Sequence, residues 1–338
     1  MGISSSLGSS ALLPAGLGFR NVLINGDFKV WQRGTSFTVT TGAPYTADRW
    51  CVTLGGAANF SVSRQTASLD GFQYCLRLQR TAANTNTSAL YLSQPVETVN
   101  SVPLANKQVS FSFYARAGAN FSAASSALNV RIVTGTGTDG NYLVATLTGQ
   151  AFQLDTTATL TTSWQRFTYS VLIPSGVNQV QPVFFYTPVG TAGAADHFEI
   201  TGVQLEQNYQ PTPFEQRPIG VELALCQRYY QRRSGTVAYS SLGGFGAAGS
   251  TTGADFDFVL PVVMRVVPTS IDYHSASGFI GSTSNASYTS TGLNIQTATA
   301  TSSVFAITLS GMTTTAGLSM RLLVNNSTSG YLGWSAEL

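Results

Sequence analysis

The side chains that could do chemistry are few and widely spaced in this chain. Its two histidines, His197 and His274, stand alone, and no metalloprotease, nucleophile-elbow or phosphate-loop motif is present. Asp255 and Asp257 share one face of a strand-like DFDF segment, and hydrolysis of a polysaccharide needs two such carboxylates facing one groove. Because phenylalanines alternate with them, the pair is typical of the solvent side of an amphipathic strand. We therefore predict no enzyme, with no catalytic residues.

Aromatic side chains offer a different chemistry, which is the stacking of sugar rings. Trp31, Trp50, Tyr91 and Tyr142 are the candidates for ligand binding, since sugar sites combine an exposed ring with flanking polar groups. The alternative for the tryptophans is that they belong to the core.

Three cysteines, Cys51, Cys75 and Cys226, are too few for a disulfide framework or a zinc site. We expect buried free thiols, and one Cys51–Cys75 bridge stays open as an alternative.

Composition favours an assembled protein without nucleic acid as a partner. Only 9% of residues are charged, against roughly 25% in ordinary soluble domains, while 43% are hydrophobic. We infer that identical neighbours cover much of the surface, so a homotrimer or another oligomer is expected, with a compositional bias of the source genome as the alternative. The net charge is +2 and the arginines are dispersed, which gives no footprint for nucleic acid.

The first twenty residues (1–20) are rich in Ser, Gly and Ala and lack the pattern of a signal peptide. We predict a docking arm that becomes ordered against a partner, or a leader without a role. No apolar run approaches the roughly 18 residues that span a bilayer, so we predict no membrane insertion.

From Asn21 onward, short alternating segments predict an antiparallel sandwich. In the segment 164–173, Phe167, Tyr169 and Val171 fall on the predicted core face. We also predict that segments 21–28 and 199–206 are the first and last strands of a jelly roll and pair in one sheet.

Prolines at 211, 213 and 218 pin an extended connector, after which residues 219–233 show the pattern of one short helix. The helix is apolar on two adjacent stripes and therefore needs two partners. It is either wedged between the two domains of its own chain or packed against copies around a threefold axis. The contact residues are predicted to be Ile219, Leu223, Leu225, Cys226, Tyr229 and Tyr230.

Residues 234–338 form a second predicted β region with almost no charge. Strands this poor in charge lack the usual protection of sheet edges, and trimer interfaces would supply it. The fold class is therefore all-β, with an N-terminal antiparallel jelly-roll β-sandwich (21–218), a connecting helix (219–233) and a C-terminal β-sandwich-like domain (234–338).

Two groups of motifs carry a family resemblance. The segments INGDF, WQRG and YTADRW between Asn21 and Trp50, with QLE, TPFEQRP and ELALCQRYYQR between Gln204 and Arg232, resemble bacteriophage structural proteins of the tail fibre or virion surface that carry a carbohydrate-binding-like jelly roll. By analogy with such modules, Asp27, Asp48 and Glu206 are candidates for a structural calcium, although we predict no metal and no cofactor.

The resemblance implies a virion protein, on the tail or the capsid surface, that is made in the host cytoplasm. The leading expectation is a trimeric tail-fibre or tail-tip adhesin that docks to other virion proteins through its N-terminal arm and attaches to host surface glycan. A purely architectural capsid decoration or head-fibre protein is the alternative, and a polysaccharide depolymerase is a third.

Overall fold

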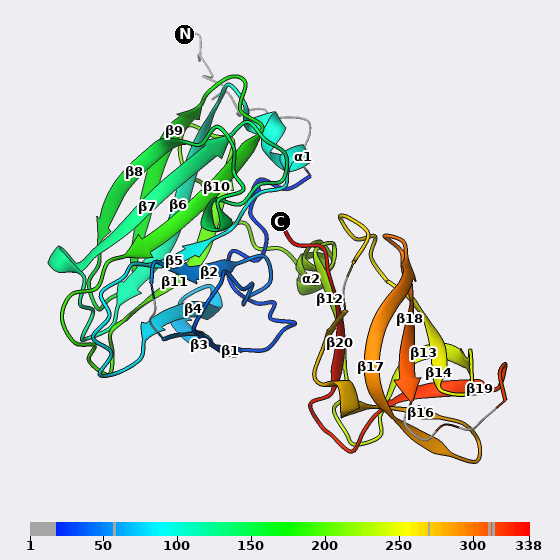
Figure 1. Ribbon diagram of the computed structural model, residues 1–338. Coiled ribbons are helices and arrows are strands. Elements are labelled where there is room, and N and C mark those ends of the chain that lie inside the picture. Colours follow the sequence, from blue (N-terminus) through cyan, green and yellow to red (C-terminus); the bar gives the residue numbers. More distant parts are fainter. Residues whose placement is uncertain (1–17, 57–58, 270, 310–311, 313–314) are drawn as a thin grey trace, which may run out of the picture.

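The computed structural model describes residues 18–338 except 57–58, 270, 310–311 and 313–314. A β-sandwich and a smaller β unit lie side by side, joined through helix α2 (Ile219–Gln227), as Figure 1 shows. Except for residues 18–20, the predicted docking arm lies outside the described residues.

Two antiparallel sheets form the sandwich, which confirms the predicted fold class. Sheet A has the order β1 (Ser36–Val39), β3 (Phe60–Leu69), β4 (Phe72–Arg80), β11 (His197–Glu206), β6 (Lys107–Ala117) and β9 (Gln165–Ile173). Sheet B has the order β2 (Cys51–Leu54), β5 (Leu90–Ser93), β10 (Gln179–Tyr186), β7 (Ala127–Gly135) and β8 (Ala151–Thr159). Four short helical segments lie in the loops: α1 (Thr98–Ser101), η1 (Val102–Leu104), η2 (Ala124–Ser126) and η3 (Tyr142–Val144).

Alternating side chains from the two sheets fill the core. Phe113 of β6 lies 4.8 Å from Phe184 of β10, centroid to centroid and edge to face, and both rings are fully buried. In β9 the predicted face, including Phe167, Tyr169 and Val171, packs against this core while the intervening residues are exposed, as the alternation predicts. The core therefore follows from a period of two read along each strand.

The segment 21–28 runs beside β11 as predicted, but it is not a regular strand. Val22 N donates to Leu205 O at 2.8 Å and Val203 N to Gly26 O at 2.9 Å. Asn25 and Phe28 have φ of 57° and 55°, which turns the chain out of the extended conformation. A side chain at Gly26 would collide with the Val203 carbonyl, so only glycine permits this approach.

The connecting helix is shorter than the predicted span of 219–233. Helix α2 ends at Gln227, and β12 (Tyr230–Ser234) pairs with β20 (Tyr331–Ser335) along all five residues. Pairing with a strand a hundred residues later overrides the local helical preference of this segment. The predicted helix is therefore wrong over residues 228–233.

The C-terminal strands close on themselves. A barrel is formed by β13 (Ser241–Ala248), β14 (Gly253–Val259), β18 (Ser302–Leu309), β17 (Ser287–Ala298), β16 (Phe279–Ser282) and β19 (Ser319–Val324), with η4 (Ala276–Gly278) before β16. Beside it, β12, β20 and β15 (Ile271–Tyr273) make a small sheet. Closure removes the open edges of the six barrel strands, so these strands have within one chain the edge protection that we expected from a trimer.

A polar junction joins the sandwich to the small sheet; we define it by Arg33, Arg49, Tyr229, Tyr230 and Glu337. Glu337 pairs with the fully buried Arg49 and lies 3.2 Å from Arg33 Nη1. The guanidinium of Arg33 stands 3.5 Å from the Tyr230 ring, and that of Arg49 stands 3.6 Å from the Tyr229 ring. Charged groups from both ends of the chain thus neutralise each other at this contact.

Candidate functional site

Two of the four predicted ligand-binding aromatics belong to the core. Trp50 is fully buried with its ring 5.1 Å from that of Phe28, and its Nε1 donates to Asn25 O at 3.0 Å. Trp31 is 8% exposed and donates to Phe28 O at 2.8 Å. Both rings are enclosed by protein and have no free face on which a sugar could stack.

The other two, Tyr91 and Tyr142, come together on the outer surface of sheet B. Strand pairing sets Tyr91 of β5 opposite Phe185 of β10, and it sets Arg131 of β7 opposite Asp155 of β8. We call this surface the aromatic face and define it by Tyr91, Arg131, Tyr142, Phe152, Asp155 and Phe185. Apolar neighbours of these residues make a cluster separate from the main core.

One guanidinium organises the aromatic face. That of Arg131 lies 4.5 Å from the Phe152 ring and 4.6 Å from the Phe185 ring, while its Nε donates to Asp155 at 2.9 Å. Tyr91 stacks on Phe185 with centroids 5.0 Å apart. Phe152 and the Asp155 side chain are 44% and 46% exposed, so rings and polar groups reach solvent together.

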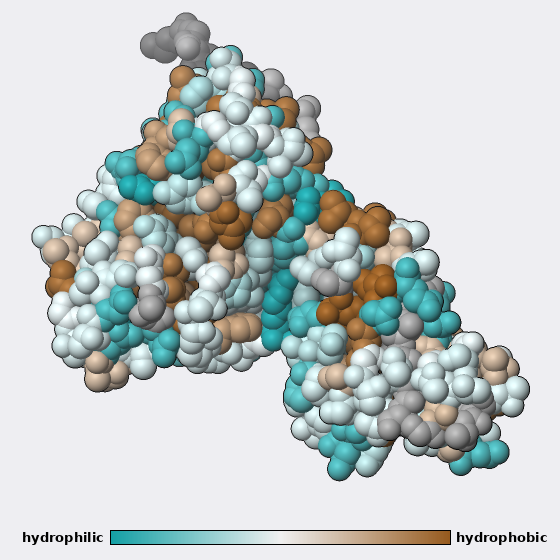
Figure 2. Space-filling model, in the orientation of Figure 1, coloured by the Kyte–Doolittle hydropathy of each residue, from teal (hydrophilic) through white to brown (hydrophobic). Residues whose placement is uncertain are grey.

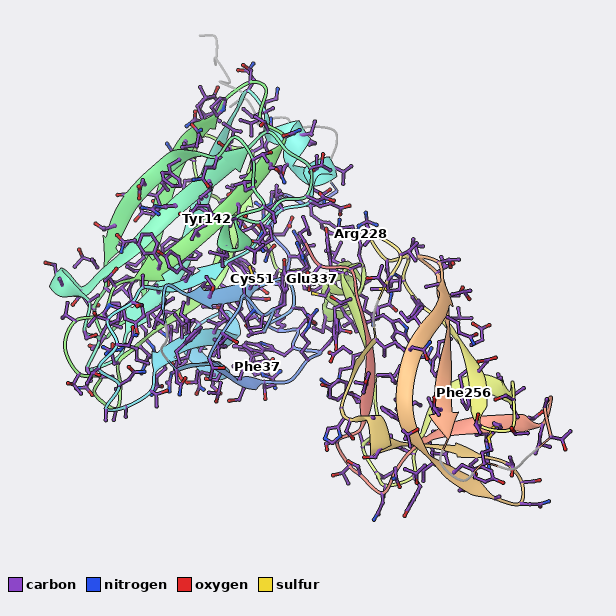
Figure 3. The ribbon with its side chains drawn as sticks, in the orientation of Figure 1. Phe37, Cys51, Tyr142, Arg228, Phe256 and Glu337 are labelled. Carbon is purple, nitrogen blue, oxygen red and sulfur yellow. The ribbon has the colours of Figure 1, made fainter. Side chains whose placement is uncertain are left out.

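The loop between β7 and β8 positions Tyr142. Tyr142 N donates to Gln181 Oε1 at 2.9 Å, and Gln181 Nε2 donates to Asn141 Oδ1 at 3.0 Å. Asn141 also caps η3 by accepting from Leu143 N. These bonds hold the Tyr142 ring at 6.0 Å from the Phe152 ring and nearly perpendicular to it. Figure 3 labels Tyr142 in the sandwich. In the same orientation, Figure 2 shows apolar residues gathered close by.

The face keeps its charge states near neutral pH. Burial raises the pKa of Tyr91 above its usual value, so the phenol stays protonated. Burial lowers the pKa of Arg131, but the hydrogen bond to Asp155 outweighs it and the pKa stands above its usual value. Arg131 therefore stays charged, and a ligand meets a neutral Tyr91 phenol beside a fixed guanidinium.

This arrangement has the parts that can stack against a saccharide and hydrogen-bond to it. The apolar face of a pyranose stacks on an aromatic ring, and its hydroxyls exchange hydrogen bonds with Arg and Asp side chains. Strand pairing lines up the outward side chains of sheet B in rows that run from β2 through β5, β10 and β7 to β8. Among the described residues of these rows around Arg131, Asp155 is the one carboxylate. Acid–base hydrolysis of a glycoside needs two.

Sequence reasoning missed Arg131, Phe152, Asp155 and Phe185, although a signal was present. Phe184 and Phe185 are adjacent in one strand, so one of them must point away from the core. Arg131 likewise stands between the buried Val130 and Ile132.

The remaining titratable candidates lie elsewhere. Phe256 and Phe258 face the barrel interior, at 0% and 1% exposure, which leaves Asp255 and Asp257 on the outside as predicted. His197 is 9% exposed, and burial lowers its pKa to about 4, so it is neutral at physiological pH.

The calcium candidates do not converge. Asp27 pairs with Lys29 at 2.5 Å, Asp48 lies 3.6 Å from Arg33, and Glu206 accepts from Thr212. Among the described residues, no three His, Cys, Asp or Glu side chains come together as a metal site.

All three cysteines are buried and free, which confirms that prediction and leaves no Cys51–Cys75 bridge. Burial raises the pKa of Cys51 and that of Cys75 to about 12, so both thiols are protonated and inert.

Helix α2 packs within its own chain. Cys226 and Tyr229 are buried against Ile24 and Val30, with Leu223, Leu225 and Leu338 at the margin. Tyr230 is buried at the junction, whereas Ile219 is 58% exposed. These contacts lie within one chain, as in the first of the two predicted arrangements, and packing around a threefold axis stays a prediction.

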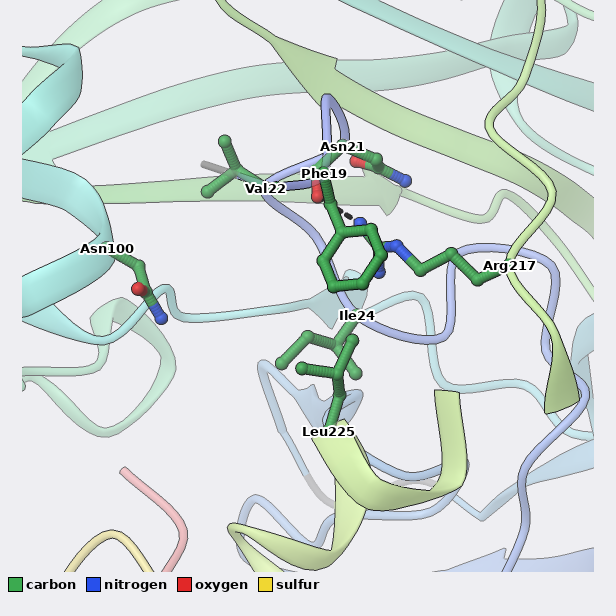
Figure 4. A pocket seen from close by; sticks show the side chains of 8 residues that line it. Phe19, Asn21, Val22, Ile24, Asn100, Arg217 and Leu225 are labelled. Carbon is green, nitrogen blue, oxygen red and sulfur yellow. Dashed lines mark hydrogen bonds between the residues drawn. The ribbon is translucent and has the colours of Figure 1, made fainter. Parts of the chain in front are cut away.

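A small pocket lies near α2, but it is not a sugar site. Phe19, Ile24, Asn100, Arg217 and Leu225 are among its lining residues, and its volume is about 100 Å³ (Figure 4). Ligand pockets usually measure roughly 300–1,000 Å³. Arg217 is already occupied there, since it donates to the carbonyls of Asn21 and Leu23.

No helix in the described ranges is long and apolar enough to cross a bilayer.

The solved structures similar to this chain include sugar-binding proteins. A putative sugar binding protein from Bacteroides thetaiotaomicron is 14% identical with a TM-score of 0.36, over 56% of this chain and 100% of that one. The CBM22-1 xylan-binding domain of Paenibacillus barcinonensis Xyn10C is 15% identical with a TM-score of 0.32, over 52% and 94% of the two chains.

A phage protein is also similar. The enzymatically active domain of bacteriophage CBA120 tailspike protein 4 is 12% identical with a TM-score of 0.32, over 56% of this chain and 21% of that one. No protein-family model and no curated protein sequence matches this chain. At these identities and TM-scores, the likenesses assign neither ligand nor function.

Proposed function

We propose that this chain is a bacteriophage virion structural protein that attaches to host surface glycan through the aromatic face of sheet B. The observation that carries the proposal is the set of four rings, Tyr91, Tyr142, Phe152 and Phe185, gathered around the Arg131–Asp155 pair on one sheet surface. Phe152 is the exposed ring of the four, Tyr91 and Tyr142 are partly buried, and Phe185 is buried and supports Tyr91 by stacking. Accessible rings beside a fixed ion pair are the recurring elements of a saccharide platform.

The place in a virion rests on the motif resemblance. The motif segments meet in the structure, because Arg33, Arg49, Tyr229 and Tyr230 from both groups build the junction with Glu337. The motifs therefore contribute to the junction, and none of the residues that define the aromatic face belongs to them. We infer a trimeric tail-fibre or tail-tip adhesin, held to other virion proteins by its N-terminal arm.

A binding experiment tests the glycan proposal. The full chain is titrated with neutral oligosaccharides prepared from host surface polysaccharide, and affinities are measured by calorimetry for the wild type and for Tyr142→Ala and Phe152→Ala. Loss of one stacked ring weakens binding about tenfold, which corresponds to about 1.4 kcal/mol. The matched control is Phe245→Ala, which removes a ring that is 91% exposed on the barrel. Equal affinities for all four proteins contradict the proposal.

The architectural alternative has its own supporting observation. Phe245 and Val259 on the barrel are 91% and 70% exposed, and exposed apolar side chains of this size favour contact with another protein. The position in the particle separates the two roles. In a cryo-EM map of the virion, trimers projecting from the tail with residues 234–338 outermost support the adhesin, whereas copies lying on the capsid lattice support decoration.

A further inference from the structure

The outer surface of sheet A, on the opposite side of the sandwich from the aromatic face, carries two arginines that share one carboxylate and a third arginine in the next row. Glu199 of β11 stands opposite Arg77 of β4 on one side and Arg116 of β6 on the other. In the next row, Tyr114 stands opposite Arg166 of β9. We call this surface the arginine face and define it by Arg77, Arg116, Trp164, Arg166 and Glu199.

Glu199 fixes two guanidinium groups side by side. Its side chain is 1% exposed, and its Oε1 accepts from Arg77 Nε at 2.9 Å and Nη2 at 2.5 Å. Its Oε2 accepts from Arg116 Nε at 2.5 Å. One buried carboxylate thus holds both arginines in defined orientations, although a single arginine would balance its charge.

The arginines keep unused donors at the surface. The side chains of Arg77 and Arg116 are 28% and 27% exposed. Within the described part of the chain, Arg77 Nη1 and both terminal nitrogens of Arg116 have no hydrogen-bond acceptor. With Arg166 also exposed, the five defining residues carry three positive charges against one negative charge. Arg166 already has partners, because its Nη2 donates to Thr212 O and Ser112 Oγ. The buried Glu206 stands two rows further along the same side of sheet A.

A ring lies beside the free donors. The Arg116 guanidinium is 4.8 Å from the Trp164 ring, and Trp164 Nε1 donates to Ala67 O at 2.7 Å, which fixes the ring. His197 adds no charge near neutral pH. The face therefore combines oriented guanidinium forks with an aromatic side chain.

We propose that the arginine face binds a saccharide carrying a carboxylate or phosphate group. Guanidinium donors match the oxygen pairs of either anion, and Trp164 gives an edge of apolar surface for the sugar ring. This second site lies on the opposite sheet from the aromatic face, goes beyond the proposed function and does not depend on it. It gives the sandwich an anionic specificity that the aromatic face, with its balanced ion pair, does not have.

The experiment uses the full chain and three probes. Oligogalacturonate presents carboxylates, mannose 6-phosphate presents a phosphate, and a neutral galacto-oligosaccharide presents neither. We expect the wild type to bind at least one anionic probe with an affinity that falls as salt is raised, since the contacts are ionic. Arg116→Gln weakens that binding at least tenfold, and Arg77→Gln with Arg116→Gln weakens it further.

Matched variants separate a site from a general charge effect. Arg321→Gln removes one exposed positive charge from the barrel and keeps the anionic affinity within twofold. Arg116→Lys keeps the charge beside Glu199 but loses the fork, so it folds and binds with intermediate affinity.

The two anionic probes decide which group the face prefers, and tighter binding of either supports the proposal. Failure of both probes to bind the wild type overturns it, as does equal weakening by Arg321→Gln and Arg116→Gln. Because the neutral probe reports on the aromatic face, failure of that site is seen separately.

Discussion

The interior of the sandwich and the junction with the C-terminal unit hold the molecule together by opposite means. Between the sheets lie apolar rings such as Phe111, Phe113 and Phe184, which exclude water without any directional partner. At the junction, Arg49 and Glu337 are buried as charges and depend on each other. Apolar burial has no preferred direction, so it does not by itself fix how two surfaces are aligned. A buried pair of charges does, because both charges lose their partner if the two units move apart.

The largest loss of stability is expected from a substitution in the apolar interior of the sandwich. Phe184→Ala removes a fully buried ring that contacts Phe111, Phe113 and Trp50. We expect the free energy of unfolding to fall by about 4 kcal/mol, from lost transfer energy and the remaining cavity. Chemical denaturation of the wild type and the variant measures this change in the free energy of unfolding. Phe245→Ala, at an exposed position, is the control and should change stability by less than about 0.5 kcal/mol. A similar loss in both variants would refute the assignment of the core.

A carboxylate whose ionisation is unfavourable, that of Asp48, lies 3.6 Å from Arg33 of the junction. Burial raises the pKa of Asp48 to about 6, although Arg33 opposes the shift. The folded state therefore binds a proton more tightly than the unfolded state, and the free energy of unfolding contributed by Asp48 falls as pH rises from about 4 to 6. The whole change amounts to about 3 kcal/mol. We expect the stability difference between wild type and Asp48→Asn to move by this order across that range.

Denaturant titrations at pH 4, 5, 6 and 7 measure this difference, and comparison with Asp48→Asn cancels the contributions of other groups. A difference that stays flat over the range would show that Asp48 is ionised freely in the folded protein. The burial of that carboxylate would then be wrong.

A third substitution tests whether the buried charge pair holds the junction together. Glu337→Gln keeps the size and one acceptor but leaves Arg49 and Arg33 without their shared carboxylate. Because Arg49 is buried, we expect a loss of about 2 kcal/mol and faster proteolysis of the connector near residues 207–218. Gel analysis of a limited digest measures the cleavage rate, and Asp257→Asn, at an exposed position on the barrel, is the control. Unchanged cleavage would mean that the junction does not rely on this pair.

The smallest effect is expected at the rim of the junction. Arg228 pairs with Glu97 at 2.6 Å but its side chain is 37% exposed. Solvent weakens such a pair, so Arg228→Gln should lower stability by less than about 1 kcal/mol. Thermal unfolding in low and high salt measures it, and a loss as large as that of Glu337→Gln would remove the distinction between the buried and exposed pairs.

The candidate site was predicted from the sequence only in part. Tyr91 and Tyr142 were predicted as ligand-binding residues and lie on one face, but Arg131 and Phe185, which complete it, were not found. Strand alternation states that Phe184 and Phe185 point to opposite faces, but it does not say which strands are neighbours. The two tyrosines are brought together by the order of sheet B and by the Gln181 contact with the β7–β8 loop.

By itself the sequence determined the all-β class, the inward residues of β9 and β14, and the buried state of the three thiols, because alternation and burial act through local pattern. Only the tertiary structure decided that α2 ends at Gln227, that the C-terminal strands close into a barrel, and that Arg49 meets Glu337. Each of these depends on hydrogen bonds or charges between segments far apart in the chain. Such pairings compete over the whole molecule, and no local window of sequence contains both partners.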